Sequence, residues 1–598
     1  MNSINSPVAL LADPITLQVM TNAIYSIADE MMAALIRTSF SSNIKDRRDC
    51  SGAVFTRDLE LVAQGEIGTP LHLGVMLPTV QTALREIGPE LLLPGDDIIV
   101  NSPYPEGPGH LNDVTIVSPV FFEGELVGYL ANMAHHVDVG GFAPGSMPFG
   151  VWEHFQEGLQ IPPVIICRQN KLDEQLLRLI SKNVRTPVEF KGDLMAQIAA
   201  NNVGERRLQA LMTKYGKDMV LLYMQELMNY SERRVLSAIN ALLPGTHSYS
   251  DFLEGDGIIT DRVKIGVTVT VQEDRIIADF SASDPQVLGP LNCRPPSTKA
   301  CVYYVIKTLL DPGLPPNSGF FRPITVITKA GSLLEVDYPG ACCNANIITT
   351  QRIVDSLMGA FVHFLPARVS AACSGTMNLL NIGARNPRTG NLYNYIETYG
   401  GGQGALFDRD GTSGVQNHMT NTRNAPVEVI ESTYPLFIHR YGLVAESAGP
   451  GMFRGGYGMF REFEIQSENT VITLSSDRFE TGPWGLSGGL SGKTGSCCLL
   501  SSDGESQQLL SKVSLRVKFG DRIISITPGG GGHGNPHFRA PEDVLTDVKE
   551  ELISRKTAFE IYGVVVTEGM AVDLHATQAL RAKLQLEVLG SRDKVSIS

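Results

Sequence analysis

Two short stretches of the sequence concentrate the side chains that bind metal ions. The first is His110-Leu-Asn-Asp113, and the second is His135-His136-Val-Asp138. Neutral imidazole and carboxylate groups together suit Zn, Mn or Fe(II), and a mixed set of nitrogen and oxygen ligands with room for water is what metal-assisted hydrolysis requires. A lone histidine is more often a hydrogen-bonded core or surface residue. Several such residues at neighbouring strand ends favour a divalent-metal site.

Asp49 is the candidate fourth member of this site. It closes a polar, charged turn that begins at Asn43, between a predicted helix and a predicted strand. If its carboxylate faces inward, burial requires a partner that neutralises it. Alternatively, Asp46, Arg47, Arg48 and Asp49 pair with one another on the surface, and the residues alone leave both interpretations open.

No other catalytic arrangement stands out in the sequence. Cys50 follows Asp49 but has no persuasive base beside it, so we do not expect a cysteine nucleophile. The stretch GLSGG at 485–489 fits Gly-x-Ser-x-Gly, but it falls inside the predicted β-rich region and not on the strand-to-helix turn of a nucleophile elbow, and there is no Walker A motif. The glycine clusters at 397–405 and 527–536 fit tight turns with positive φ better than an anion cradle. ATP use, if any, would therefore depend on a partner subunit.

A helix and several strands are predicted to position the metal-binding side chains. Apolar residues recur every three or four positions from Leu17 to Leu35, which predicts a long helix after Pro14. Residues 97–139 are predicted to form short strands separated by Gly/Pro-rich loops, and one loop holds His110 and Asp113. The polar residues therefore gather at strand ends.

The rest of the chain predicts an α+β multi-domain fold, with a mixed α/β N-terminal metal-binding part, an α/β middle and a β-rich C-terminal part with a helical tail. Helices are expected over 193–243, from 349 to about 365, and over 542–563, ending at Gly563. Gly-punctuated strands from about 440 to 528 predict a sandwich or a barrel. The expected domains are 1–245, 246–440, 441–540 and 541–598.

Composition and charge restrict the possible partners and location. The 63 acidic residues outnumber 49 basic ones, giving a net charge of −14, and no Lys/Arg block could follow a nucleic acid or an anionic membrane. No apolar run reaches the roughly 20 residues that span a bilayer, and the N-terminus lacks the basic start of a secretion signal. We therefore expect a cytoplasmic protein that binds neither nucleic acid nor membranes, with reduced cysteines.

Longer motifs, in order along nearly the whole chain, resemble one family. They are NIKDRRDCSGAVF, GHLNDV, MAHHVDVGG, EGLQIPP, NVRTPVEFKGDLMAQIAANNVG, ETYGGGQGA, HMTNTRNAPVEVIE, MFRGGYGMFRE and TPGGGGHGNP. Together they resemble the hydantoinase B/oxoprolinase family from about residue 13 to about residue 566. Relatives in this family include subunits of ATP-dependent hydantoinases, oxoprolinases and lactamases, and of acetone- and acetophenone-type carboxylases.

The resemblance implies particular ligands for the metal. By motif, His110 and Asp113 of GHLNDV, one histidine of MAHHVDVGG, and Asp49 of KDRRDCS match the metal site of the family. Alternation along the strand end and the ligand spacing in the carboxylase relatives favour His135, with His136 as the alternative. The expected ion is Zn, Mn or Fe, and Asp49 is also the expected catalytic residue, as ligand or base.

The resemblance also implies a partner and a reaction. The partner is a larger hydantoinase A-type subunit with an actin-like fold, which binds ATP and phosphorylates the substrate within a higher hetero-oligomer. The expected function is ATP-dependent opening of a small cyclic amide, a hydantoin or a related lactam. Alternatives are a subunit of an ATP-dependent ketone carboxylase of the acetone or acetophenone type, and a non-catalytic metal-binding scaffold. The shared motifs do not choose among them.

Overall fold

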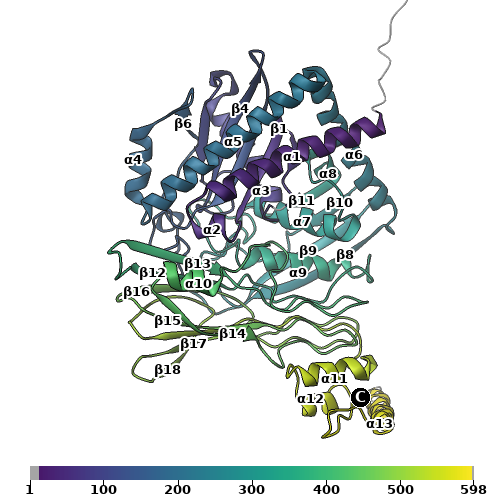
Figure 1. Cartoon of the computed structure of the whole chain (residues 1–598). Coiled ribbons are helices and arrows are strands. Elements are labelled where there is room, and N and C mark those ends of the chain that lie inside the picture. Colours follow the sequence, from purple (N-terminus) through teal and green to yellow (C-terminus); the bar gives the residue numbers. More distant parts are fainter. Residues whose placement is uncertain (1–12, 67, 596–598) are drawn as a thin grey trace, which may run out of the picture.

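The N-terminal part is built on one antiparallel sheet, seen behind α1 and α5 in the computed structural model of Figure 1, which describes residues 13–66 and 68–595. The sheet has seven strands in the order β2-β1-β5-β4-β3-β6-β7. Their bounds are β1 (Cys50–Thr56), β2 (Leu61–Gln64), β3 (Asp97–Val100), β4 (Asp113–Phe122), β5 (Glu125–His135), β6 (Val164–Arg168) and β7 (Lys171–Leu172).

Helices cover both faces of this sheet, because successive strand side chains point to opposite faces. Val54 of β1 packs with α1 (Pro14–Thr38), α5 (Pro187–Tyr215) and α6 (Lys217–Asn240). Its neighbours Ala53 and Phe55 pack in the other cluster, with α3 (His72–Ile87). The sheet is thus buried on both sides, and functional side chains are left to gather at its ends.

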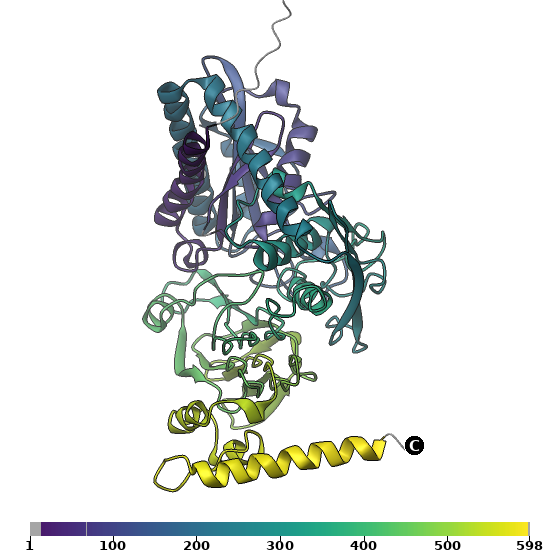
Figure 2. The same cartoon turned by 90° about the vertical axis from the view of Figure 1, so that its right-hand side faces the viewer.

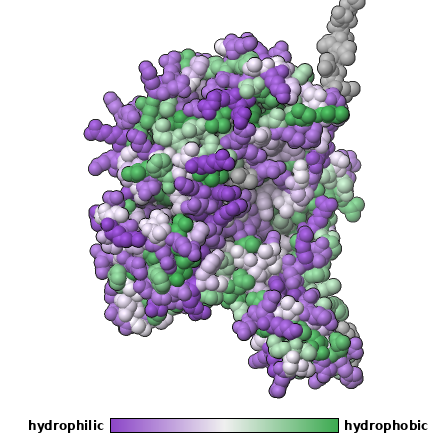
Figure 3. Space-filling view, viewed as in Figure 1, coloured by the Kyte–Doolittle hydropathy of each residue, from purple (hydrophilic) through white to green (hydrophobic). Residues whose placement is uncertain are grey.

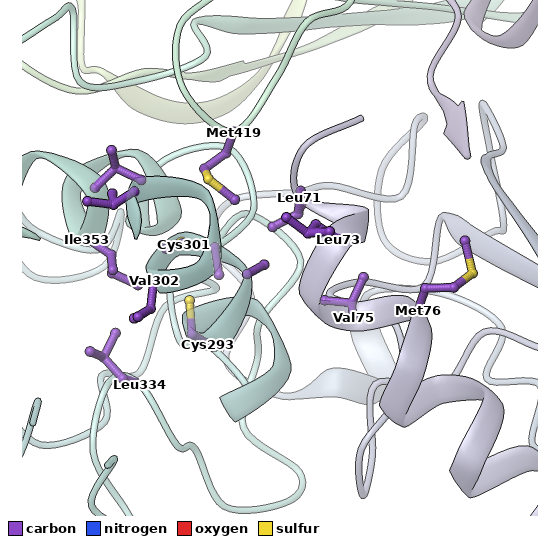
Figure 4. Close-up of a cluster of buried hydrophobic side chains, with 14 of the residues drawn as sticks. Leu71, Leu73, Val75, Met76, Cys293, Cys301, Val302, Leu334, Ile353 and Met419 are labelled. Atoms are coloured by element: carbon purple, nitrogen blue, oxygen red, sulfur yellow. The ribbon is translucent and has the colours of Figure 1, made fainter. Parts of the chain in front are cut away.

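A second sheet and two buried helices form the middle of the molecule. The sheet order is β11-β10-β9-β8, with β8 (Gly245–Leu253), β9 (Val263–Val271), β10 (Ile276–Asp279) and β11 (Ile324–Ile327). Helix α7 (Pro295–Leu310) packs between α3 and α9 (Thr349–Phe361), and Figure 4 shows the apolar side chains of this region. A side chain on Gly74 of α3 would lie 2.4 Å from the Cα of Ala300, so glycine permits the close crossing of α3 and α7.

Two further sheets form a sandwich, which settles the choice between sandwich and barrel. One sheet has the order β13-β12-β16-β19, and the other β14-β15-β20-β17-β18. Apolar residues from both, such as Leu380 and Phe463, share one cluster. The bounds are β12 (Leu379–Arg385), β13 (Leu392–Thr398), β14 (Leu436–Leu443), β15 (Met459–Ile465), β16 (Thr470–Ser475), β17 (Ser496–Leu500), β18 (Ser506–Leu509), β19 (Lys512–Val517) and β20 (Arg522–Ile526).

The two glycine clusters pack extended backbones closely together, and the predicted tight turns are wrong for most of them. Successive N–H groups of residues 529–532 donate to the carbonyls of Lys493, Gly456, Ala372 and Leu490. Gly529 and Gly532, three positions apart, both bond to the segment 490–493, and three residues is the period of a polyproline II helix. None of these four glycines has a positive φ. Because their N–H groups already bond to carbonyls, this cluster is also no anion cradle.

The tail contains three helices and projects from the body in Figures 1 and 3. They are α11 (Pro541–Lys549), α12 (Arg555–Glu560) and α13 (Leu574–Val595), which runs along the base of the molecule in Figure 2. The single helix predicted over 542–563 is wrong, because Glu551 adopts a φ of 58° and breaks it. Buried Tyr457 of the body packs with α11 and α12.

The predicted fold class is confirmed, as are the helix after Pro14 and the strands near 97–139. The helical stretch predicted over 193–243 is two helices, because the chain turns at Gly216 with a φ of 89°. Strands β12 and β13 precede the boundary predicted at 440, yet β12 pairs with β16 beyond it. The remaining short helices are α2 (Ser42–Lys45), α4 (Glu174–Asn183), α8 (Ser318–Phe321), α10 (Val427–Thr433), and the 3-10 turns Pro89–Leu91, His154–Gln156 and Pro536–Phe538.

Among the described residues, no helix combines the length and the apolar character needed to cross a membrane. All nine cysteines are free, and eight of them are buried, which fits the expected reduced thiols. Burial raises the pKa of the Cys50 thiol well above its ordinary value, so this side chain is a poor nucleophile.

The glycine packing predicts a large stability loss for Gly530→Ala. The added Cβ would lie 2.0 Å from the carbonyl oxygen of Gln403, and neither backbone can withdraw without breaking its neighbours' hydrogen bonds. We expect the free energy of unfolding to fall by ~2–4 kcal/mol, measured by denaturant titration. Gly569→Ala is the control, because its Cβ would meet only a side-chain oxygen at 3.9 Å. Equal stability of the two variants would contradict the packing argument.

Candidate metal centre

Three polar residues stand side by side at one end of the N-terminal sheet. The order β1-β5-β4 and the register Asp113↔His135 place Asp113 of β4 beside His135 of β5. On the other side, Cys50 pairs with Ala134, and the His135 N–H donates to the carbonyl of Asp49 at 3.1 Å. Asp49, His135 and Asp113 therefore form a row across three neighbouring strands.

His110 completes the group from the loop that enters β4. The Asp113 N–H donates to the His110 carbonyl at 3.2 Å, and this turn brings the His110 Nε2 within 3.1 Å of the Asp113 carboxylate. The rings of His110 and His135 lie 4.9 Å apart between centroids. One ligand atom each from His110, Asp113 and His135 lie within 4.8 Å of one another, all on buried residues.

The donor chemistry of this group fits a divalent metal. The His110 Nδ1 lies 3.0 Å from the carbonyl of Cys343, to which it donates, so Nε2 is left to face Asp113. A second hydrogen bond of this kind fixes the tautomer and the ring orientation of a metal-binding histidine. Two imidazoles and a carboxylate suit Zn, Mn or Fe. The residues present therefore fit the ion that the sequence predicts.

Strong mutual charge effects hold the buried group together. Burial by itself raises the pKa of Asp113, but His110 and His72 outweigh it and hold that pKa far below its usual range. Burial lowers the pKa of His110, but Asp113 outweighs it and raises the net value. Burial, followed by the charge of His110, lowers the pKa of His135 to about 4. The site thus presents an ionised carboxylate and a neutral His135, the forms that bind metal.

Asp49 lies on the wall of the same cavity as the three residues, although outside the 4.8 Å group. Its Oδ1 accepts a hydrogen bond from the Thr69 hydroxyl at 2.9 Å. The described residues do not form the alternative surface cluster around Asp49. Arg47 is buried at 2 % exposure and makes no ion pair with Asp49. Asp49 therefore has the position expected of a fourth participant.

The structure separates His135 from His136. The His136 Nε2 lies 2.9 Å from the Gln197 side-chain oxygen, and its ring packs against Phe190 at 4.6 Å. Asp138 is also directed elsewhere, because it accepts hydrogen bonds from Arg185 and from the N–H groups of Gly140 and Gly145. Of the two histidines, only His135 faces the group, and its role as a metal ligand stays a prediction.

Two further polar residues of the cavity wall, His72 and Asn43, were not expected from the sequence. The His72 Nε2 lies 3.7 Å from Asp113, and its Nδ1 lies 2.9 Å from the Ser51 hydroxyl. The Asn43 Nδ2 lies 3.1 Å from the His135 Nδ1, and its oxygen accepts from Arg47 at 2.8 Å. His72 stands alone in the sequence, so only its place at the start of α3, beside the sheet end, identifies it.

The cavity itself is small and has a larger neighbour. It encloses about 30 Å³ and is lined by residues that include His110, Arg47 and Thr398. By the rule that a water needs about 10–15 Å³ of such space, it accommodates about two or three water-sized atoms. A second cavity of about 900 Å³, lined by α1, α6 and α7, shares Thr69 with it. The larger one has the volume of a small-molecule site.

A second buried cluster supports the first one. The His154 Nδ1 lies 2.6 Å from Glu157, whose other oxygen accepts the N–H groups of Cys342 and Cys343 at 2.6 and 2.7 Å. The Cys343 carbonyl is the one that orients His110. The His154–Glu157 pair thus fixes the backbone behind the metal-binding group.

The chain matches the family described as hydantoinase B/oxoprolinase over residues 13–536. It is 35% identical to 5-oxoprolinase 1 of Arabidopsis thaliana over 88% of this chain and 42% of that protein. It is 31% identical to the caprolactamase subunit beta of Pseudomonas jessenii, over 95% of this chain and 99% of that one.

Two solved structures have the same fold. The ATP-dependent caprolactamase of Pseudomonas jessenii superposes with a TM-score of 0.88 at 29% identity, over 96% of this chain and 100% of that one. The nucleotide-free structure of acetone carboxylase, an enzyme of ATP-dependent acetone carboxylation, gives a TM-score of 0.90 at 18% identity, over 98% of this chain and 84% of that one. At that identity the second match shows the fold alone.

The geometry predicts that metal content depends on His135 and not on His136. We expect about one transition-metal ion per wild-type chain by elemental analysis, and a fall of about 100-fold in metal affinity for His110→Ala and His135→Gln. His136→Gln is the matched control, since its ring bonds to Gln197 outside the group. Full metal content in His135→Gln, or loss only in His136→Gln, would contradict the assignment.

Proposed function

The chain belongs to the hydantoinase B/oxoprolinase family, and from this premise we propose that it is the metal-dependent subunit of an ATP-dependent cyclic amide hydrolase. The substrate would be a hydantoin or a related lactam that a partner subunit has phosphorylated. The observation that supports this most is the row of Asp49, His135 and Asp113 beside His110. It is a mixed nitrogen and oxygen set of the kind that hydrolytic metal sites use.

Phosphorylation explains why a partner and ATP are needed. The carbonyl carbon of an amide is a poor electrophile, and transfer of a phosphoryl group to the carbonyl oxygen converts that oxygen into a leaving group. Attack of water on that carbon gives a tetrahedral adduct whose C–N bond breaks, and the nitrogen takes up a proton and leaves as the amine of the opened ring. A second water then hydrolyses the acyl phosphate that remains, which gives the carboxylate and inorganic phosphate. When bound, a divalent cation supplies Lewis-acid chemistry that acidifies water at neutral pH.

The residues of this chain would orient water and move its proton. His110, Asp113 and His135 would hold the ion. Asp49, on the same cavity wall, would bind the ion or accept the proton of the attacking water, and the Thr69 hydroxyl orients its carboxylate. The larger cavity beyond Thr69 has room for a cyclic amide ring.

The partner is proposed from the relatives. The caprolactamase relative is named as a subunit, and this chain covers 99% of it. The Arabidopsis 5-oxoprolinase is more than twice as long as the part that this chain matches. We propose that this chain acts with a larger, ATP-binding, hydantoinase A-type subunit, which corresponds to the part of the Arabidopsis protein that this chain does not match. The two subunits would form a hetero-oligomer in the cytoplasm.

A reconstitution experiment tests this proposal. The chain alone should neither hydrolyse ATP nor open hydantoins, whereas the co-expressed pair should release ADP or AMP together with a ring-opened product. Carboxylated product from a ketone would assign the pair to the carboxylase branch instead. Unchanged turnover after complete removal of the metal would support the scaffold alternative.

The position of Asp49 predicts a catalytic defect without unfolding. Asp49→Asn keeps the size of the side chain but removes its charge, so turnover of the reconstituted pair should fall by about 10²-fold or more. Melting temperature should stay near that of the wild type. Asp46→Asn is the control, because Asp46 belongs to the same turn but does not line the cavity. Near-normal turnover of Asp49→Asn would remove Asp49 from the site, while lost turnover with retained metal would favour a base over an essential ligand.

A further inference from the structure

Arg47 is a buried cation without a counter-charge. Its side chain is 2 % exposed and lines the small cavity, and it forms no ion pair with any described residue. Burial of a guanidinium is unfavourable unless its charge and its hydrogen-bonding groups find partners. The other buried arginines among the described residues all pair with carboxylates; they are Arg352, Arg461, Arg478 and Arg539. Arg47 therefore differs from the buried arginines that serve structure.

Neutral acceptors take only three of the five N–H groups of the Arg47 guanidinium. Nη1 donates to the Asn43 side-chain oxygen at 2.8 Å and to the Ile396 carbonyl at 2.6 Å, and Nη2 donates to the Thr398 hydroxyl at 2.8 Å. Nε is buried and has no partner. Of the five N–H bonds of a guanidinium, this leaves one on Nε and one on Nη2.

The chemistry of the two remaining donors indicates their ligand. Nε and Nη2 belong to one planar fork, which matches two oxygens of a carboxylate or a phosphoryl group in a bidentate pair. The bonds to Asn43, Ile396 and Thr398 fix the plane of that fork before any ligand arrives. Such a preorganised fork is favourable for binding an anion, because little side-chain entropy remains to be lost.

The charges around the cavity also favour an anion. The two negative charges of Asp49 and Asp113 would balance a divalent ion held by the metal-binding group. The positive charge of Arg47 would then be left without a balancing negative charge. The cavity accommodates about two or three water-sized atoms, enough for an ion and an oxygen or two of an oxyanion, but not for a substrate ring.

We infer that Arg47 is the binding residue for the phosphoryl group of the activated substrate. Its Nε and Nη2 donate to two phosphoryl oxygens, and Asn43 links it to His135 on the opposite side. Arg47 transfers no proton in this role. The inference rests on the proposed function, because the phosphoryl group is the one that the partner subunit would attach.

Inorganic phosphate is the probe for this subsite. Titration of the metal-loaded full chain by calorimetry should show phosphate binding that weakens about 10-fold or more in Arg47→Met, with unchanged metal content. Lys45→Met removes an equal charge from an exposed position in the same turn, and should bind phosphate as the wild type does. Arg47→Lys keeps the charge but loses the planar fork, so its affinity should be intermediate, and it serves if Arg47→Met does not fold.

Three outcomes would overturn the inference. They are absence of phosphate binding by the wild-type chain at millimolar concentration, equal affinity in Arg47→Met and wild type, and acetate binding as tightly as phosphate with the same dependence on Arg47. The last would assign the fork to a carboxylate.

Kinetics of the reconstituted pair separate this inference from the proposed reaction. If the pair opens a lactam, Arg47→Met should lower the turnover number for ring opening at least 10-fold with wild-type metal content, because the phosphorylated substrate loses its contact, and wild-type turnover would overturn the subsite while the reaction stands. If the wild-type pair opens no cyclic amide but phosphate still binds through Arg47, the reaction class fails and the oxyanion subsite stands.

Discussion

The strand register at one end of the N-terminal sheet is the constraint on which the site depends. The pairing of β1 with β5 and of β5 with β4 sets Asp49, His135 and Asp113 next to one another, and a slip of one residue would turn each side chain to the opposite face. Both faces of the sheet carry apolar side chains that pack against helices, so burial on each side holds the register. Core packing and site geometry are therefore enforced by the same hydrogen-bonded ladder.

The second constraint is the buried charge of Asp113. An isolated carboxylate at this depth is unfavourable, and His110 and His72 stabilise it from two sides while Asn346 donates at 3.4 Å. The partners of these residues are themselves fixed: Ser51 lies against His72, and the Cys343 carbonyl against His110. The site is consequently a network that reaches from the sheet end to the Glu157 carboxylate.

Much of this could be predicted from the sequence, and the reasons for the failures are physical. His110, Asp113 and His135 lie near strand ends in short motifs, so local pattern was sufficient to bring them together. Residues of the wall such as Thr398 come from the sandwich, more than 300 positions from Asn43, and one sequence offers no signal for so distant a contact. For Arg47 the sequence left open a surface pairing with Asp49, because a run of charged residues is usually a solvated turn.

The glycine clusters failed for a different reason. Glycine is used both where φ is positive and where another backbone comes too close for a Cβ, and composition does not separate the two uses. Here residues 529–532 lie beside the segments near 372, 456 and 490, and their N–H groups donate hydrogen bonds to the backbone carbonyls of these segments. This packing joins the loop that follows β20 to the loops that flank β13 and β15. Strand β13, which leads into this packing, supplies the Ile396 carbonyl and the Thr398 hydroxyl to Arg47 at the end of the N-terminal sheet. The cavity is thus formed where a ladder with fixed register meets strand β13, and the closely packed glycines that follow this strand resist shifts of its backbone.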